Sequence, residues 1–369
     1  MTSSLNLCIA ALSMTICINS CKSETGNKSV KNKSMAPVAS VPQISYKFLS
    51  PLPNQSYNIG KEINVSLQKT DSLAVDSLIL SIENVSIPVN PLSDLKVNIP
   101  TKGFKTGTAR LKLNIYPGGS KNPQTISLPV KFLSDIKPKV YTYKVINEFP
   151  HDRGAYTQGF EYSNGYFFEG TGQRGESFLR KTVYNTGEII KSRSLSSDLF
   201  GEGITLLNGK IYQVTYQTQV GFIYDMESFE QLQKIYYQNR EGWGLTNNGK
   251  DIIMSDGTHV LYFMDPEYFS VLHRIEVYNN IQEVDSLNEL EYINGLIYAN
   301  RFLTDQIVII DPVNGKVVGK ADMSGLLKPE DRQQRTDVLN GIAWDNEKNL
   351  LYVTGKYWPK VFQVQLIPK

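Results

Sequence analysis

The sequence predicts an all-β protein in which an immunoglobulin-like β-sandwich precedes a five-bladed β-propeller. The first observation is a repeated unit that combines a strand, a glycine turn and a second strand ending in aromatic and polar residues. Several short strands repeated every 40 to 50 residues or so are typical of propeller blades. The second observation is a run of short alternating apolar and polar segments across residues 43–138, which is typical of a β-sandwich. The five repeats open near Gly159, Gly203, Gly244, Leu290 and Gly341.

Length and composition fit this two-domain interpretation. A chain of 369 residues exceeds one typical small domain, and 41% hydrophobic with 20% charged residues describes a globular protein. The 21 tyrosines suit a β-rich fold, because aromatic rings pack well on pleated surfaces. A net charge of +2 gives no reason to expect a nucleic acid partner.

The N-terminal segment predicts export and a lipid anchor. Leu5 to Ile18 is apolar but shorter than the roughly 20 residues that span a bilayer, and the small residues of "INSC" end it at Cys21. This pattern resembles a bacterial lipoprotein signal, in which residues 1–20 are removed and Cys21 is lipidated. The resemblance implies a protein anchored in a membrane of the bacterial cell envelope, on the periplasmic side or at the cell surface. One departure from the lipoprotein pattern is that no Lys or Arg precedes the apolar run, and the alternative is an ordinary cleaved signal with a chance cysteine.

The next two segments predict a tether and the sandwich. Residues 21–42 are rich in Ser, Lys and Asn and contain no aromatic residue, which indicates a flexible tether. Residues 43–138 contain about seven short strands separated by Pro, Gly and Asn turns, as an immunoglobulin-like sandwich requires. This segment contains no cluster of acids, histidines or nucleophiles. It is either a spacer that lifts the second domain off the membrane or a module that binds carbohydrate or protein, and the spacer is favoured.

Residues 139–369 form the predicted propeller. Its last repeat, which ends with "KVFQVQLI", has fewer strands than the other four. Because an open ring would expose unpaired strand edges, we expect residues 140–148 to supply the missing outer strand. The insertion at 324–339, which carries charges of both signs, is interpreted as a helical loop on one rim.

The propeller topology predicts a site at one mouth of the ring. The first two strands of a blade run antiparallel, so the start of the first and the end of the second lie on the same rim. This brings together motifs such as "FGEG", "EGWG" and "LNELE" with strand ends such as "EGTGQ", "QVTYQ" and "TGKYW". Polar groups on an aromatic-walled concave surface are the default hypothesis for a binding site. The converging side chains are Gln158, Glu202, Tyr216, Trp243, Asn288, Phe302 and Lys356.

Six motifs, in the same order and with similar spacing, resemble the plant-type glutaminyl-peptide cyclotransferases, or glutaminyl cyclases. They are "FPHDRGAYTQGFE", "FGEGIT", "EGWGLT", "LNELEYINGLIYAN", "DVLNGIAWD" and "VTGKYWPKVF", and the resemblance covers residues 145–366. It implies a five-bladed propeller that converts an N-terminal glutamine to pyroglutamate and releases ammonia without a catalytic zinc. It permits a structural calcium ion on the axis and implies no cofactor for catalysis.

The resemblance also implies roles for particular residues. The family's catalytic glutamate, asparagine and lysine fall on Glu202, Asn288 and Lys356. Two pocket positions depart from the family pattern, because Tyr216 and Phe302 stand where relatives commonly carry tryptophan. The other residues of the substrate pocket fall on Tyr156, Gln158, Phe200 and Trp243.

The same residues suit the chemistry without the resemblance. An α-amine, with a pKa of about 7.7 to 8.0, must lose its proton to become a nucleophile, and an amide nitrogen must gain one to leave. Glu202 can act as base and then as acid if partial burial raises its pKa against the effect of Lys356. Lys356 and Asn288 are suited to donate hydrogen bonds to the oxyanion. Together with what the resemblance implies, the prediction is a zinc-independent acyltransferase, expected to be a monomer, that acts on peptides or proteins with N-terminal glutamine.

Two other functions stay open at this point. One is a non-catalytic envelope propeller that binds peptides or a protein partner. The other is a metal-dependent lactonase propeller with acids and asparagines around an axial ion. His151, His259 and His273 lack metal-ligand spacing, which argues against a zinc hydrolase. Ammonia release from glutamine peptides would separate the predicted enzyme from the binding protein.

Overall fold

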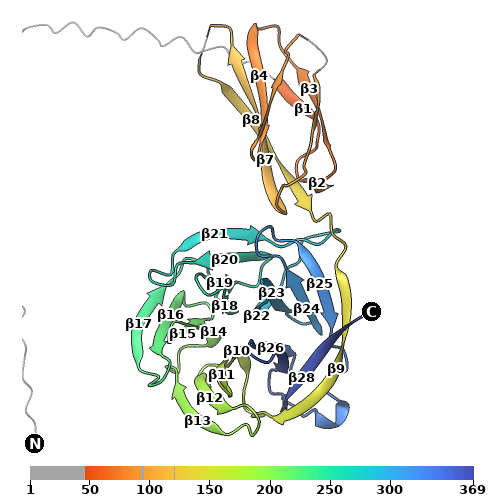
Figure 1. The fold of residues 1–369 in the computed structure, drawn as a ribbon. Coiled ribbons are helices and arrows are strands. Elements are labelled where there is room, and N and C mark those ends of the chain that lie inside the picture. Colours follow the sequence, from red (N-terminus) through yellow and green to blue (C-terminus); the bar gives the residue numbers. More distant parts are fainter. Residues whose placement is uncertain (1–45, 93–94, 120) are drawn as a thin grey trace, which may run out of the picture. The chain divides into compact units, whose positions relative to one another are not determined.

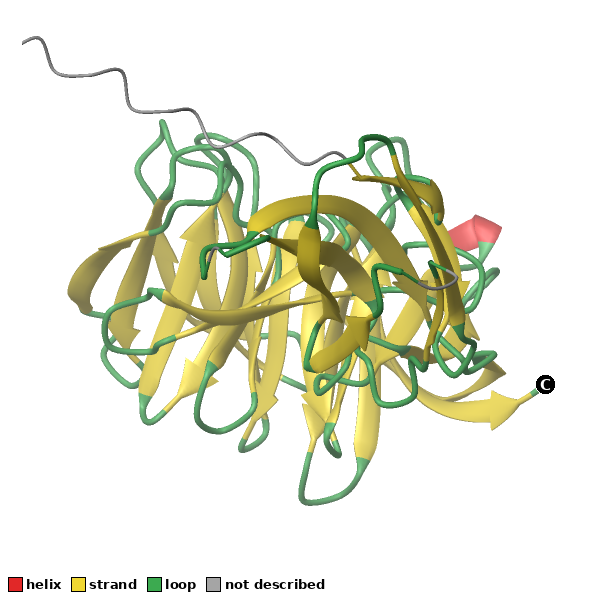
Figure 2. Ribbon diagram, turned by 90° about the horizontal axis from the view of Figure 1, so that it is seen from above, coloured by secondary structure: helices red, strands yellow, loops and turns green. Residues whose placement is uncertain are grey.

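The computed structural model describes residues 46–369, except 93–94 and 120. The predicted signal peptide, the tether and the lipidated Cys21 lie outside the described residues. Gln43–Lys369 forms one compact unit, whose described part is all-β with 28 strands and one short 3-10 helix (Figures 1 and 2). No helix in this described part is long and apolar enough to cross a membrane.

The first eight strands form two sheets around one hydrophobic core. β1, β3 and β6 form one sheet, and β2, β8, β7, β4 and β5 form the other in that order. Both sheets contribute to a buried cluster that includes Ile63, Leu80 and Val130. Buried and more exposed residues alternate along β7, as expected for a strand with one face toward the core. The bounds are β1 Tyr46–Ser50, β2 Gln55–Asn58, β3 Ile63–Lys69, β4 Val75–Ile82, β5 Val85–Val89, β6 Lys96–Ile99, β7 Gly107–Pro117 and β8 Gln124–Leu133.

Three four-stranded antiparallel sheets lie further along the chain, and each is built from four consecutive strands. Asn-Gly turns connect the first two strands in two of these sheets, and both residues of each turn, such as Asn164 and Gly165, have positive φ. Such turns match the twist of the strands that they join. The bounds are β10 Thr157–Ser163, β11 Tyr166–Thr171, β12 Phe178–Val183, β13 Ile189–Ser194, β14 Gly201–Leu207, β15 Lys210–Thr215, β16 Val220–Asp225, β17 Gln231–Tyr236, β18 Leu245–Asn247, β19 Ile252–Ser255, β20 Val260–Met264 and β21 Val271–Glu276.

The last two groups of strands merge into one eight-stranded sheet because β9 (Lys139–Pro150) joins them. β9 pairs antiparallel with β28 from Lys360 to Pro368, and its first residues pair in parallel with β25. The strand predicted at 140–148 therefore does lie at the outer edge of the last group. The bounds are β22 Leu287–Ile293, β23 Leu296–Arg301, β24 Gln306–Ile310, β25 Val317–Asp322, β26 Leu339–Asp345, β27 Leu350–Gly355 and β28 Lys360–Pro368.

The first strands of the five groups pack against one another in the closed order β10, β14, β18, β22, β26 and back to β10 (Figure 1). Glycines near the openings of these strands allow the close approach. A Cβ atom on Gly159 would lie 2.3 Å from the nitrogen of Ile204, and one on Gly244 would lie 2.0 Å from the carbonyl oxygen of Asn288. Any larger side chain would therefore push neighbouring strands apart.

Three glutamates also join these inner strands by accepting backbone hydrogen bonds. Glu161 on β10 accepts from Leu206 on β14 at 2.8 Å. Glu289 on β22 accepts from β10 at 3.1 Å and from β26 at 2.8 Å, and Glu291 accepts from β26 at 2.9 Å. Burial raises the pKa of all three carboxyl groups, that of Glu161 to about 8.

The insertion at 324–339 is mostly irregular, so the predicted helical loop is wrong for all but one turn. Only Pro329–Asp331 forms a 3-10 helix, labelled η1. Leu326 and Leu327 are buried, but no residue of η1 is, so the segment has no apolar face long enough to pack a helix. Figure 2 shows this single red turn among the strands.

Candidate active site

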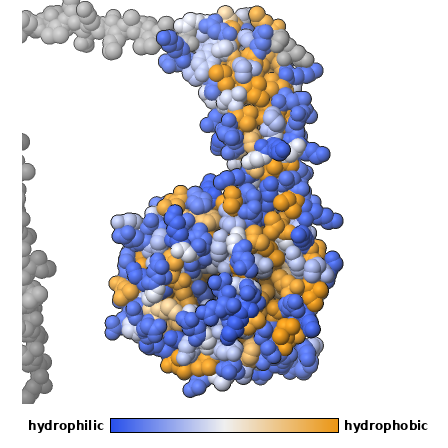
Figure 3. All heavy atoms as spheres, in the orientation of Figure 1, coloured by the Kyte–Doolittle hydropathy of each residue, from blue (hydrophilic) through white to orange (hydrophobic). Residues whose placement is uncertain are grey.

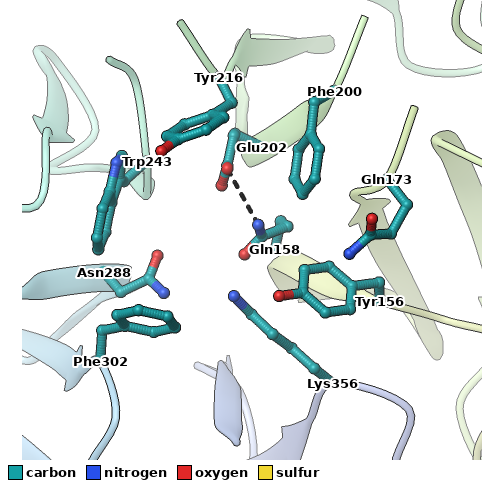
Figure 4. A pocket seen from close by; sticks show the side chains of 10 residues that line it. All are labelled: Tyr156, Gln158, Gln173, Phe200, Glu202, Tyr216, Trp243, Asn288, Phe302 and Lys356. Atoms are coloured by element: carbon teal, nitrogen blue, oxygen red, sulfur yellow. Dashed lines mark hydrogen bonds between the residues drawn. The ribbon is translucent and has the colours of Figure 1, made fainter. Parts of the chain in front are cut away.

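Hydropathy does not single out a site, because hydrophilic and hydrophobic residues are interspersed over the face drawn in Figure 3. The candidate site is instead a pocket at the opening ends of the inner strands, which combines polar groups with aromatic walls (Figure 4). All nine side chains expected from the sequence line this pocket, and each of the five strand groups, with its adjoining loops, supplies at least one of them. The lining residues are Tyr156, Gln158, Gln173, Phe200, Glu202, Tyr216, Trp243, Asn288, Phe302 and Lys356.

Glu202 lies on β14 between two glycines and is only 4% exposed. The side-chain amide of Gln158 donates a hydrogen bond to its Oε1 at 3.0 Å. That amide is itself oriented, because Nδ2 of Asn340 donates to Oε1 of Gln158 at 3.2 Å and to the carbonyl oxygen of Thr157 at 2.8 Å. Two amides in series therefore hold the carboxyl group of Glu202 at the pocket. Figure 4 shows the hydrogen bond between Gln158 and Glu202.

The charges around Glu202 oppose one another. Burial raises the pKa of its carboxyl group well above the usual range, while the charge of Lys356 lowers that pKa and the charge of Glu241 raises it. Burial likewise lowers the pKa of Lys356, against the charges of Glu202 and Asp337. A carboxyl group with a raised pKa beside a cation is suited both to take and to give a proton.

Lys356 and Asn288 present polar groups to the same space. Nζ of Lys356 lies 4.6 Å from the ring centroid of Tyr156 and 5.0 Å from that of Phe302. This cation–π contact offsets part of the cost of burying the ammonium group. Asn288 is 2% exposed, and its Oδ1 has no hydrogen-bond partner among the described residues. A buried oxygen without a partner costs free energy, so a substrate that donates a hydrogen bond to it would be stabilised.

Aromatic rings form two walls of the pocket. Phe200 packs against Tyr156 and Tyr216, with centroids 6.0 and 5.7 Å apart. Trp243 packs edge to face against Phe302 at 5.5 Å. Tyr216 and Phe302, the two departures from the family pattern, therefore both belong to the walls.

A second carboxylate supports one wall from behind. Glu241 accepts hydrogen bonds from Nε1 of Trp243 at 3.0 Å and from the amide of Gln217 at 2.9 Å. Because the indole is bonded at its only donor, the plane of the Trp243 ring is fixed.

Three residues that complete the site were not predicted. Gln173 lines the pocket, Asn340 orients Gln158, and Glu241 holds Trp243. All three stand in motifs that the sequence singled out, "EGTGQ", "LNGIA" and "EGWG". Motif and spacing marked these segments, but the roles depend on side-chain contacts that the sequence does not show.

No group of three or more His, Cys, Asp or Glu side chains in the described part of the chain could hold a metal ion. The side chain of His151 is only 7% exposed, and its Nε2 lies 3.0 Å from Oε1 of Glu169. Burial lowers the pKa of this histidine, but the charge and hydrogen bond of Glu169 outweigh that effect and raise it overall. His151 is thus committed to a buried ion pair.

Fold and site together define an all-β protein in which a ring of strands brings a carboxyl group, an ammonium group and amides into one aromatic pocket. The chain belongs to the glutamine cyclotransferase family, whose model matches residues 122–366. The resemblance inferred from the six motifs is therefore confirmed.

Two proteins that are similar to this chain are a glutaminyl-peptide cyclotransferase and a glutaminyl cyclase by name. A glutaminyl-peptide cyclotransferase of Arabidopsis thaliana is 42% identical over 237 residues, which cover 63% of this chain and 73% of that protein. The crystal structure of the glutaminyl cyclase of Myxococcus xanthus matches with a TM-score of 0.59 at 31% identity, and covers 63% of this chain and 100% of that one. Each match leaves 37% of this chain without a counterpart.

Proposed function

We propose that this chain is a glutaminyl-peptide cyclotransferase, an acyltransferase that converts the N-terminal glutamine of a peptide or protein to pyroglutamate and releases ammonia. The observation that carries the proposal is the buried carboxyl group of Glu202, which shares one aromatic pocket with Lys356 and Asn288. Membership of the glutamine cyclotransferase family and the names of the two relatives agree with this reaction.

In this reaction one bond forms and one breaks within a single residue. The neutral α-amine adds to the carbonyl carbon of the side chain, the ring C–N bond forms, and the carbonyl oxygen takes the negative charge. Lys356 and the amide of Asn288 are suited to donate hydrogen bonds to that oxygen. The bond to the amide nitrogen then breaks, the carbonyl is restored, and ammonia leaves. The aromatic walls contribute by holding glutamine in the folded conformation that brings amine and carbonyl together.

Glu202 moves the proton between these steps. It takes a proton from the substrate amine and gives it to the leaving nitrogen, so it ends the cycle unchanged. The attacking nitrogen becomes positively charged when it adds, and this charge favours the carboxylate form of Glu202, which lets Glu202 act first as a base. Burial raises the pKa of Glu202. Once Glu202 has taken the proton, burial therefore stabilises the protonated form until the leaving nitrogen accepts the proton.

We further propose that the five strand groups form a five-bladed β-propeller, an interpretation supported by the closed order of their inner strands. Residues 43–138 are proposed to form an immunoglobulin-like sandwich, which the two sheets around one core support. In this proposal Cys21 carries a lipid that holds a monomeric enzyme at the bacterial cell envelope, and the sandwich is the spacer.

Incubation with a short glutamine peptide tests the proposed function. Ammonia should appear together with a peptide that is lighter by the mass of ammonia. EDTA or phenanthroline should leave the rate unchanged, because the proposed chemistry needs no zinc. Peptide binding without ammonia release would favour a non-catalytic binding protein instead. Loss of activity that only zinc restores would contradict zinc independence.

A further inference from the structure

Gln173 is the pocket residue that the proposed reaction does not use. It lies in the connection between β11 and β12, and its side chain points into the pocket near Phe200 and Tyr156 (Figure 4). Gln158, Glu202 and Asn288 are almost fully buried, whereas Gln173 is half-buried, so it lies closer to the pocket mouth. Its side-chain amide forms no hydrogen bond with any described residue.

The backbone of Gln173 is held in a conformation that glycine would adopt more easily. Its φ is +82°, in the left-handed region. The turn is anchored, because the hydroxyl group of Ser177 donates to the carbonyl oxygen of Gln173 at 2.7 Å and accepts from the nitrogen of Gly201 at 2.9 Å. The backbone N–H of the preceding residue, Gly172, donates to the carbonyl oxygen of Tyr156 at 2.8 Å. A strained residue with a free side chain in a pocket indicates a functional role for that side chain.

The substrate has a matching group at this place. The reacting amine and side-chain amide of the N-terminal glutamine must lie at Glu202 and Lys356, so the rest of the peptide leaves through the mouth. The part of the substrate nearest the mouth is therefore the peptide bond after glutamine, which offers one hydrogen-bond acceptor and one donor. A primary carboxamide offers one acceptor and two donors and can bond with both. Free glutamine has a carboxylate there, which offers no donor.

We propose that Gln173 is a specificity-determining residue whose carboxamide hydrogen bonds with the peptide bond that follows the N-terminal glutamine, so that peptides are preferred over free glutamine. This inference rests on the proposed function. It names the substrate class as peptides and proteins, and it assigns the recognition of the peptide backbone to one side chain.

The test compares glutaminyl-alanine amide with free glutamine in wild type and in Gln173→Gly. Glycine removes the side chain and keeps the left-handed backbone, so the fold is retained. The ratio of kcat/KM for the peptide to that for glutamine should fall about 3- to 10-fold, the effect of losing one or two net hydrogen bonds. Arg174→Ala, at the exposed neighbour on the same turn, is the matched control and should leave the ratio unchanged.

A depsipeptide isolates the donor of the peptide bond. Replacing that N–H by an ester oxygen should lower kcat/KM severalfold in wild type and have a much smaller effect in Gln173→Gly. An unchanged peptide-to-glutamine ratio in an active Gln173→Gly variant would overturn the inference and leave the proposed function standing. An equal loss with both substrates would assign Gln173 a structural role and overturn it too. A wild-type protein that releases no ammonia from either compound would overturn the proposed function and this inference together.

Discussion

At the scale of single residues, the proposed proton transfer by Glu202 can be removed by one substitution. Glu202→Gln keeps the shape of the side chain and an oxygen that can accept the hydrogen bond from Gln158. It cannot shuttle a proton, so ammonia release should fall by roughly 10² to 10⁴-fold. Thermal unfolding and circular dichroism should match wild type. Activity within a few fold of wild type would remove Glu202 from the catalytic role.

The aromatic walls predict effects on substrate binding. Trp243→Ala should raise KM strongly, because it removes the ring that packs on Phe302 and is held by Glu241. Phe302→Trp, alone or with Tyr216→Trp, should lower KM for a short glutamine peptide, since a larger ring buries more apolar area at roughly 25 cal/mol per Å². These walls contact substrate and transition state alike, so kcat should change little. Steady-state kinetics with one peptide decide the matter, and unchanged KM values in all three variants would place the pocket elsewhere.

The sequence predicts the pocket's polar centre better than its supporting contacts. Glu202 and Lys356 stand next to glycines and Asn288 stands in the motif "LNELE", and repeat spacing places all three on one rim. Asn340 could not be assigned in this way, because it acts through a hydrogen bond to Gln158 in a distant segment. Glu241 bonds to Trp243 within its own motif, and spacing does not show that contact either. Spacing shows which rim a residue occupies, but not which neighbour it contacts.

At the scale of elements, the three glutamates that join the inner strands predict a pH dependence of stability. Burial raises the pKa of Glu161 from about 4.5 to about 8. The folded state therefore binds this proton more tightly than the unfolded state, and the stabilisation is complete below pH 4.5 and lost as pH rises through 8. The melting temperature should thus decrease as the pH is raised from about 4.5 to about 8.

Glu161→Gln tests this assignment. Glutamine keeps an oxygen for the backbone N–H of Leu206 but does not ionise. Differential scanning calorimetry across pH 5 to 9 should show a flatter decline in the variant than in wild type. The decline should not vanish, because burial also raises the pKa of Glu289 and Glu291. Parallel curves for the two proteins would contradict the role given to Glu161.

A strand could be predicted from the sequence where a strand group lacked one of its four strands. The structure of the insertion could not be predicted, because only its composition was available. The last strand group has three strands of its own, so an outer strand had to come from elsewhere, and β9 supplies it. The insertion at 324–339 has charges of both signs, which fits a helix surface and an irregular loop equally well. Its buried Leu326 and Leu327 are adjacent, and a helix needs apolar residues on one face over several turns.

At the scale of the whole molecule, β9 predicts where the chain can be shortened. A chain that begins at residue 139 keeps β9 and should release ammonia at close to the rate of the full protein. A chain that begins at residue 151 exposes the edge of β28, so it should melt at a clearly lower temperature or aggregate. Thermal unfolding and ammonia release of the two purified proteins decide this. Equal stability would show that β9 does not close the ring.

Because every one of the five strand groups supplies a pocket residue, the site also constrains how a gene of this kind can evolve. Repeat proteins commonly gain or lose units by duplication and deletion, and a ring with one unit more or fewer can still close. Here such an event would remove a lining residue or move Glu202, Asn288 and Lys356 out of reach of one another. The number of repeats is therefore fixed by the chemistry of the site rather than by closure of the ring. Variation is left to single substitutions in the walls, to the connecting loops, and to domains added outside the ring.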